Sequence, residues 1–418
     1  MRYFEILYNS FTGFARFLPD SSPVSRLTLT FLCVKPIIKQ IITLSCSILP
    51  QKGDVSLLQN ASVFRLRVPG SGNRIELLDF MRGTGMLLVL LHHSDLPGNL
   101  SHWILSFHMP YLFLLSGYTL YLRPPAGPFR TFLCSRFLRL IVPYFLFEGL
   151  NLFVWSASLY LQGGWQDVTD AAAAILACLN TEGYTGYYGR LWFWPCMFIS
   201  DLLFYCIHRL SPRKQIAQRI YLPVMIAAML LLSWITCRRL PFRLPFTADT
   251  AFMATVFLLA GYLLGPRITW LIQKTHLLAD IGLLLLSLAA MFWSVPRCGG
   301  SLMMFINQYG HYGYSVCAAF SGTLCFLLFS KWLYGVLAGR DSLKSIVLWY
   351  GYNSLATFPV HLSVKMWIYQ TFPLSFRQWY ILLPAMFLLN IPIVNVITRF
   401  FPFMLGKLPY IQKKKSSV

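Results

Sequence analysis

Hydrophobic residues run along most of this chain in blocks of about 17 to 25 residues, each long enough to cross a bilayer as a helix. Short polar or basic connections separate the blocks. The pattern predicts an all-α, polytopic membrane protein with ten transmembrane helices. We expect these helices at Leu77 to Ser94, His102 to Leu122, Phe137 to Leu161, Leu191 to Arg209, Tyr221 to Cys237, Asp249 to Gly265, His276 to Val295, Tyr312 to Tyr334, Ser345 to Gln370 and Trp379 to Phe401.

Composition agrees with this class. Hydrophobic residues make up 56% of the chain, charged residues only 12%, and the mean hydropathy is +0.58. Soluble domains carry a charged fraction of about 25%. The net charge of +21 would suggest nucleic acid in a soluble protein, but here the basic residues lie between hydrophobic blocks. We therefore expect no nucleic-acid partner. The ten cysteines are scattered singly, without metal-ligand spacing, and indicate small apolar side chains rather than disulfides.

Basic residues in short connections predict the orientation, because such residues favour the cytoplasmic side. Alternate connections between the helices form two sets, and one set is richer in basic residues. This richer set predicts that both ends of the ten-helix unit are cytoplasmic. The cluster from Arg238 to Arg243 runs against this pattern, so the fifth and sixth helices are the least secure. The richer set contains Arg123, Arg130, Arg136, Arg139, Arg209, Arg213, Lys214, Arg219, Lys331, Arg340, Lys344, Lys413, Lys414 and Lys415.

Three regions follow from these patterns. Residues 1–70 form an amino-terminal extension of uncertain role, 71–405 the transmembrane domain, and 406–418 a basic cytoplasmic tail. The apolar stretch from Leu27 to Leu49 contains Lys35, Pro36 and Lys39 and precedes no small-residue cleavage site, so we expect no signal peptide. It is either an amphipathic surface segment or an extension upstream of the true start. Residues 163–190 form the longest outward-facing connection.

The first predicted helix, LLDFMRGTGMLLVLLHHS, carries charged and titratable residues in an otherwise apolar segment. Such residues are costly in a bilayer and are therefore usually functional and inward-facing. Arg82 and His93 are eleven residues apart, about three turns, so they lie on one stripe roughly 16 Å apart along the axis. His92 points about a quarter-turn away. Asp79 precedes Arg82 by one turn, which predicts an i,i+3 ion pair that orients the arginine.

Six sequence blocks carry a resemblance to a known family. In order along the chain they are RIELLDFMRGTGMLLVLLHHS, SFHMPYLFLLSGYTLYL, FLCSRFLRLIVPYF, LWFWPCMFISDLLFY, FLLAGYLLG and YGYNSLATFPVHL. Together they resemble the membrane-bound acyltransferase 3 family, over Arg74 to Phe401. The family's first-helix arginine and histidine map onto Arg82 and His93, not His92. The F-H-M-P block at Phe107 to Pro110 resembles the branch of fucose O-acetylases and exopolysaccharide acyltransferases.

The resemblance implies transfer of an acyl group, usually acetyl from acetyl-CoA, to a sugar hydroxyl of a cell-surface or exported glycan such as lipopolysaccharide or exopolysaccharide. It implies an acyl-CoA donor rather than a bound cofactor, a glycan or lipid-linked sugar acceptor, lipid contact, and a bacterial cytoplasmic (inner) membrane location. The esterase-like domain fused to some relatives is not expected here. The acyl group, acetyl or succinyl, stays open, as does the choice between an acyl-histidine and direct transfer.

Acyl transfer to a sugar hydroxyl needs a base or nucleophile near pH 7. Histidine suits this role, because its unperturbed pKa lies nearest to neutral pH. We predict His93 and Arg82 as catalytic residues. Arginine forks suit the phosphates of the donor, so Arg136 and Arg139 are predicted to bind it, with anchoring of the third helix as the alternative. The acceptor is predicted to contact His108 and His361, for which packing is the alternative. Glu148 and Asp201 should face the bundle interior, where either assists the base or neutralises an arginine. Glu148 is also included among the predicted substrate-binding residues.

Two other functions fit ten helices with buried charge. A transporter or flippase of lipid-linked sugars would often show an internal repeat, and the arginine–histidine block has no counterpart in the second half of the chain. A non-catalytic assembly partner is the third reading. The intact Arg82 and His93 argue against it.

Overall fold

The computed structural model of the 418-residue chain describes residues 75–163, 169, 191–212, 214–273, 277–300, 302–372 and 377–406. The predicted amino-terminal extension, nearly all of the 163–190 connection and all but the first residue of the basic tail lie outside these residues. Contacts divide the chain into two units, one of Met1–Ser62 with Ala157–Asp167 and one of Val63–Ser156 with Val168–Val418. The account below concerns the second unit.

Most of the described residues are helical, and among them the pairing of Met303 with Gln308 is an isolated bridge outside any strand. The all-α class predicted from the sequence is therefore confirmed for this part of the chain. The helices are α4 (Glu76–His92), α5 (Gly98–Leu105), α6 (His108–Leu122), α7 (Phe129–Arg136), a π-helical turn (Phe137–Ile141), α8 (Val142–Gly163), α10 (Phe193–Leu210), α11 (Gln215–Arg239), α12 (Ala248–Leu263), α13 (Gly265–Gln273), α14 (Leu277–Ser294), α15 (Tyr312–Val336), α16 (Asp341–Tyr352), α17 (Ser354–Thr371) and α18 (Trp379–Phe400).

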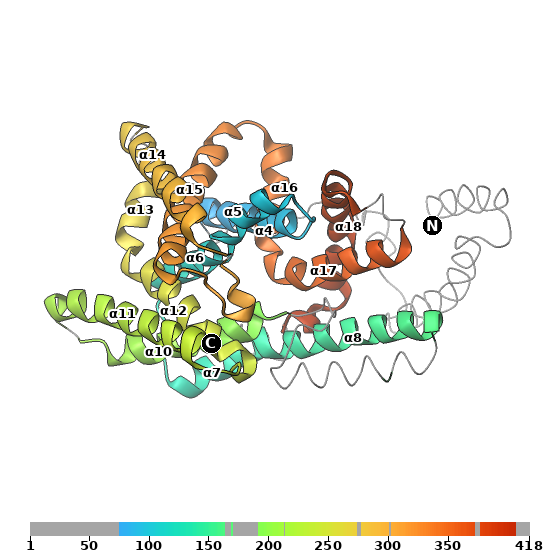
Figure 1. Cartoon of the computed structure of the whole chain (residues 1–418), viewed down its shortest axis with the longest axis horizontal. Coiled ribbons are helices and arrows are strands. Elements are labelled where there is room, and N and C mark those ends of the chain that lie inside the picture. Colours follow the sequence, from blue (N-terminus) through green and yellow to red (C-terminus); the bar gives the residue numbers. More distant parts are fainter. Residues whose placement is uncertain are drawn as a thin grey trace, which may run out of the picture. The chain divides into compact units, whose positions relative to one another are not determined.

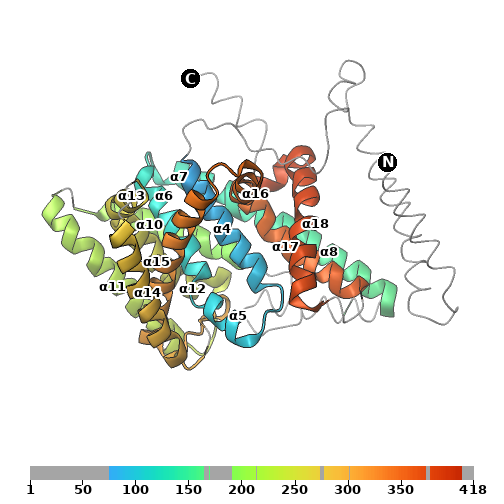
Figure 2. The same ribbon diagram turned by 90° about the horizontal axis from the view of Figure 1, so that it is seen from above.

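Helix α4 lies at the centre of the unit, with α6, α15, α16 and α17 packed around it (Figure 1, Figure 2). Glycines allow its closest contact. A Cβ on Gly83 would overlap the backbone carbonyl of Val347 on α16, and a Cβ on Gly351 would overlap the carbonyl of Asp79. Small residues let helix backbones approach closely in membranes. The Gly83–Gly351 contact therefore sets the position of Arg82, which precedes Gly83 on α4.

Two predicted helices are broken in the structure. The expected helix from His102 to Leu122 is divided into α5 and α6 at Ser106 and Phe107. The backbone of Phe107 leaves the helical region, at φ −137°. Pro110 sits in the first turn of α6. Its ring would clash with the carbonyl four residues earlier if the helix were continuous, so proline favours a helix start here.

The expected helix from Ser345 to Gln370 is likewise two helices, α16 and α17, joined at Asn353. The Asn353 side chain donates a hydrogen bond to the carbonyl of Trp349, and its own carbonyl accepts from the backbone N–H of Thr357. Asn353 thus bonds both to the last turn of α16 and to the first turn of α17. The break lets α16 pack along α4 while α17 takes a different course (Figure 1).

The remaining predicted helices occur close to their expected limits, and α7 and α13 are additional short helices. Five helices of the described chain are long and apolar enough to cross a membrane: Ile216–Arg239, Pro245–Leu263, Leu277–Arg297, Tyr312–Val336 and Trp379–Phe400. The total of ten spans and their orientation stay predictions.

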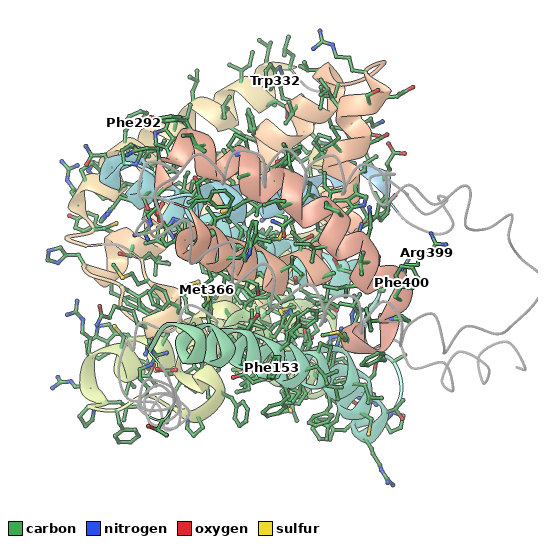
Figure 3. The ribbon with its side chains drawn as sticks, turned by 90° about the vertical axis from the view of Figure 1, so that its right-hand side faces the viewer. Phe153, Phe292, Trp332, Met366, Arg399 and Phe400 are labelled. Carbon is green, nitrogen blue, oxygen red and sulfur yellow. The ribbon has the colours of Figure 1, made fainter. Side chains whose placement is uncertain are left out.

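The core lies around α12, where nearly every side chain from Ala251 to Ala260 is buried. By contrast, large apolar side chains point outward from the peripheral helices. Phe153 on α8, Phe292 on α14 and Trp332 on α15 are 71%, 65% and 61% exposed, and Figure 3 labels all three. An exposed apolar surface of this extent is typical of a protein whose outer face meets lipid.

Candidate active site

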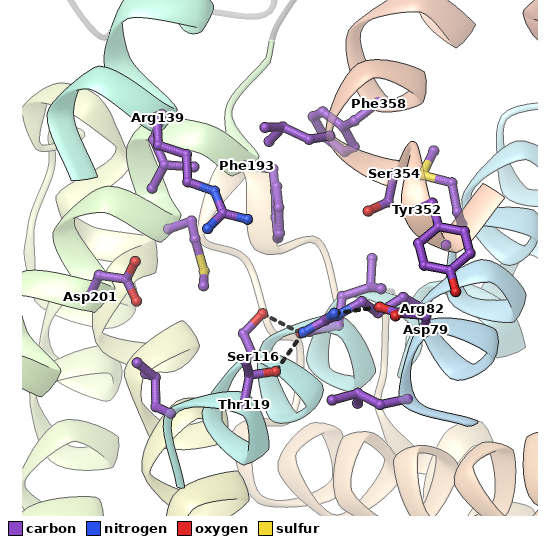
Figure 4. A pocket seen from close by; sticks show the side chains of 18 of the residues that line it. Asp79, Arg82, Ser116, Thr119, Arg139, Phe193, Asp201, Tyr352, Ser354 and Phe358 are labelled. Atoms are coloured by element: carbon purple, nitrogen blue, oxygen red, sulfur yellow. Dashed lines mark hydrogen bonds and ion pairs between the residues drawn. The ribbon is translucent and has the colours of Figure 1, made fainter. Parts of the chain in front are cut away.

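A cavity of about 570 Å³ opens between α4, α6, the α7 region, α10 and the α16–α17 junction (Figure 4). Four arginines line it: Arg82 on α4, Arg123 at the end of α6, Arg136 at the end of α7 and Arg139 in the π-helical turn. Asp79 and Asp201 are the acidic residues in the described part of its lining. Four guanidinium groups against two carboxylates leave the cavity positively charged.

Asp79 and Thr119 both hold Arg82 in place. Its Nη1 lies 2.8 Å from Oδ1 of Asp79, and its Nη2 donates to Oγ1 of Thr119 at 2.6 Å. The ion pair with Asp79, predicted from their spacing, is confirmed. Because Asp79 is buried and Thr119 belongs to α6, these bonds fix the guanidinium at the cavity wall between two helices.

Arg136 and Arg139 lie on the other wall. Nε of Arg136 is 3.1 Å from Oδ2 of buried Asp201, which confirms the reading of Asp201 as a carboxylate that neutralises an arginine. Figure 4 shows the guanidinium of Arg139 pointing into the cavity. The two arginines are three residues apart, and the wide turn at Phe137–Ile141 carries the chain from one to the other.

Four histidines form a continuous row near the other end of α4. Ring centroids are 5.0 Å apart for His108 and His92, 5.1 Å for His92 and His93, and 5.0 Å for His93 and His361. His92 ends α4, His93 caps it, His108 begins α6 and His361 lies on α17. The row thus joins α4, α6 and α17.

Two of these histidines have their tautomer set by backbone carbonyls. Nδ1 of His108 lies 3.0 Å from the carbonyl oxygen of Ile104, and Nδ1 of His361 lies 3.3 Å from that of Thr357. A carbonyl only accepts, so each Nδ1 carries the hydrogen and each Nε2 keeps a lone pair. His361 is fully buried, and its Nε2 has no hydrogen-bond partner among the described residues. This nitrogen can accept a proton or a hydrogen bond.

An ion pair closes the row on the side away from the arginines. Nζ of Lys365, one turn after His361 on α17, lies 2.6 Å from Oδ1 of Asp95 in the connection after α4. His92 contacts Ser101 of α5 through its Nδ1 at 3.3 Å. These contacts join α4, α5 and α17 around the histidines.

The residues predicted from the sequence fall into two sets. Arg82, Arg136 and Arg139 line the cavity, whereas His93, His108 and His361 lie in the histidine row. Glu148 belongs to neither set. Its carboxylate on α8 accepts a hydrogen bond from the backbone N–H of Leu191, at 2.7 Å, and so holds the start of the α10 segment.

Sequence reasoning did not single out Arg123, Phe193 or Phe358 as site residues, although all three line the cavity. The signal for Arg123 was its place in the same basic connection as Arg136 and Arg139. Phe193 and Phe358 lie within two of the six sequence blocks but have no distinguishing chemistry of their own. His92 was set apart from His93 by its direction, yet the structure places it between His93 and His108.

The sequence model of the acyltransferase domain, that of the acyltransferase 3 family, matches residues 75–399. The chain therefore belongs to the acyltransferase 3 family, and the cavity and the histidine row both lie within the matched region. The family and the apolar helices together make it a membrane acyltransferase. A search of curated proteins gives no significant match.

Proposed function

We propose that this protein transfers an acyl group, acetyl from acetyl-CoA, to a sugar hydroxyl of a surface or exported glycan. The observation that carries the proposal is the placement of two unlike sites along α4, an arginine-lined cavity at Arg82 and a histidine row at His93. Acyl transfer from a thioester needs both: a binding site for a polyanionic donor and a base near the acceptor.

The arginine-lined cavity suits the donor. CoA carries several phosphate groups, and planar guanidinium forks bind phosphate oxygens in pairs. Arg82 is pre-oriented by Asp79 and Thr119, so it loses little conformational freedom when a phosphate binds. Arg123, Arg136 and Arg139 provide the further positive charge.

The histidine row suits the transfer step. In direct transfer, His93 takes the proton of the sugar hydroxyl while the hydroxyl oxygen attacks the thioester carbonyl carbon. The carbon–sulfur bond then breaks, and the CoA thiolate leaves and takes the proton. His361, whose Nε2 lone pair is available, supports His93. The centroids of the two imidazole rings are 5.0 Å apart. An acyl-histidine on His93 would divide the same transfer into two steps.

The proposal also assigns each of the two sites to one side of the membrane. Both ends of the ten-helix unit are cytoplasmic, the membrane is the bacterial inner membrane, and the arginine cavity faces the cytoplasm, where CoA is made. The glycan approaches from the side of the Lys365–Asp95 pair. The thioester arm of the donor then spans the distance between the two sites along α4, about 16 Å.

Mass spectrometry of surface glycans tests this function. Cells with the gene should carry glycans with an acetyl increment that disappears on deletion and returns with the wild-type gene. The His93→Ala variant, present in the membrane at wild-type level, should fail to restore it. Glycans that are identical with and without the gene would contradict the proposal, and loss of the whole glycan rather than of its acyl group would favour a flippase.

A further inference from the structure

A pair of phenylalanines connects the wall of the arginine cavity to the histidine row. The rings of Phe193, the first residue of α10, and Phe358 on α17 lie with their centroids 5.1 Å apart. Both line the cavity, and Figure 4 shows them together at one end of it. None of the four histidines belongs to the described cavity lining.

Phe358 touches both sites. One of its neighbours is Phe193 in the cavity, and another is His361, whose ring centroid lies 5.7 Å away. His361 in turn contacts His93 at 5.0 Å. The path from the arginines to the histidines through these contacts therefore passes the ring of Phe358.

The two rings differ in how they are held. Phe358 is buried and also packs against Trp194, at 6.3 Å. Phe193 is only half-buried and rests against Phe113, at 5.0 Å. Because Phe193 is less buried than Phe358, its ring has more room to change rotamer. Phe358 is thus the more enclosed of the two rings, and it is the one in contact with His361.

We propose that Phe358, with Phe193 as the movable partner, determines which acyl groups reach His93 and selects short, uncharged ones. This inference rests on the proposed function, because it concerns the donor of that same transfer. A longer chain must displace the enclosed ring of Phe358. A carboxylated chain such as succinyl must leave a charge against aromatic rings, and burying a charge without a partner is strongly unfavourable. Acetyl meets neither obstacle.

Competition between donors tests the proposal. Purified protein in nanodiscs is given acetyl-, butyryl-, hexanoyl- and succinyl-CoA with glycan acceptor, and mass spectrometry measures each product. Wild type should prefer acetyl. Phe358→Ala should raise the hexanoyl-to-acetyl product ratio about tenfold or more, since even one methylene changes discrimination in an apolar pocket about 10- to 200-fold.

A matched control is Phe320→Ala. Phe320 packs against Phe257 at 4.8 Å and lines no part of the cavity, so this variant should keep the wild-type ratio. Phe358→Leu keeps an apolar side chain and guards against misfolding of the alanine variant. It should give a smaller shift in the same direction, as should Phe193→Ala.

The outcomes separate the two proposals. If the variants transfer acetyl but all keep the wild-type donor ratio, Phe358 does not select the acyl group and this inference is overturned. If Phe358→Ala is inactive, an unchanged ratio in Phe358→Leu and Phe193→Ala overturns it equally. If folded wild-type protein transfers no acyl group from any donor, the proposed function itself fails.

Discussion

The imidazole rings of His93 and His361 lie 5.0 Å apart, although one caps a helix near the start of the domain and the other lies on its penultimate long helix. The contact exists because α17 begins at the Asn353 break and runs past the end of α4. It places a histidine with an available Nε2 lone pair beside the residue predicted to act as the base.

The first prediction concerns this pair. Loss of general acid–base assistance typically costs about 10²- to 10⁴-fold in rate, so His93→Ala should lower acyl transfer by that factor while CoA binding is retained. His92→Ala should be much milder. The rate of acyl transfer by purified variants, with CoA binding measured in parallel, checks this. A dead His92→Ala beside an active His93→Ala would contradict the assignment.

The second prediction concerns Arg82. Arg82→Lys keeps the charge but loses the planar fork that bonds Asp79 and Thr119. Hydrogen bonds to charged groups contribute about 1.5–3 kcal/mol, so calorimetry should show CoA affinity weakened by roughly ten- to a hundredfold. Arg399→Lys is the control, because Arg399 is exposed and lies outside the cavity lining. Equal affinities of wild type and Arg82→Lys would assign Arg82 to structure alone.

The third prediction concerns the packing of α4 on α16. Gly351→Ala puts a methyl group against the carbonyl of Asp79, so the two helices must move apart. Overpacking of this kind costs about 1–3 kcal/mol, and Asp79 holds Arg82. The variant should therefore lose both thermal stability and CoA affinity. Gly335→Ala, where a Cβ meets open space, should lose neither. If Gly351→Ala has wild-type stability and CoA affinity, close packing of α4 on α16 is not needed for either.

The fourth prediction tests the sidedness of the protein. Short-connection charge bias places the tail in the cytoplasm and the 163–190 connection outside. A reporter fused after Lys415 should indicate cytoplasm, and a cysteine introduced at Gly164 should react with an impermeant thiol reagent added to intact cells. Both positions lie outside the described residues. The opposite result at both would turn the arginine cavity away from the CoA pool and exclude the proposed donor route.

The sequence by itself determined the features that depend on neighbours along the chain. Hydrophobic block length gave the all-α class, and helical spacing gave the Asp79–Arg82 ion pair, because partners one turn apart meet in any helix. The six blocks identified the family. The spacing of Arg82 and His93 also predicted that the two lie far apart on one helix, the separation on which the proposed route between cavity and histidine row depends.

Only the tertiary structure decided how separate helices meet. The breaks at Phe107 and Asn353 lie inside continuous apolar blocks, where hydropathy gives no signal of a change in direction. These breaks place His108 and His361 in one row with His93 and turn Phe358 toward the arginine cavity. Glu148 lies apart from both sets because its helix carries it to Leu191. Such contacts depend on close packing between helices distant in sequence, which the local periodicity of a single chain does not encode.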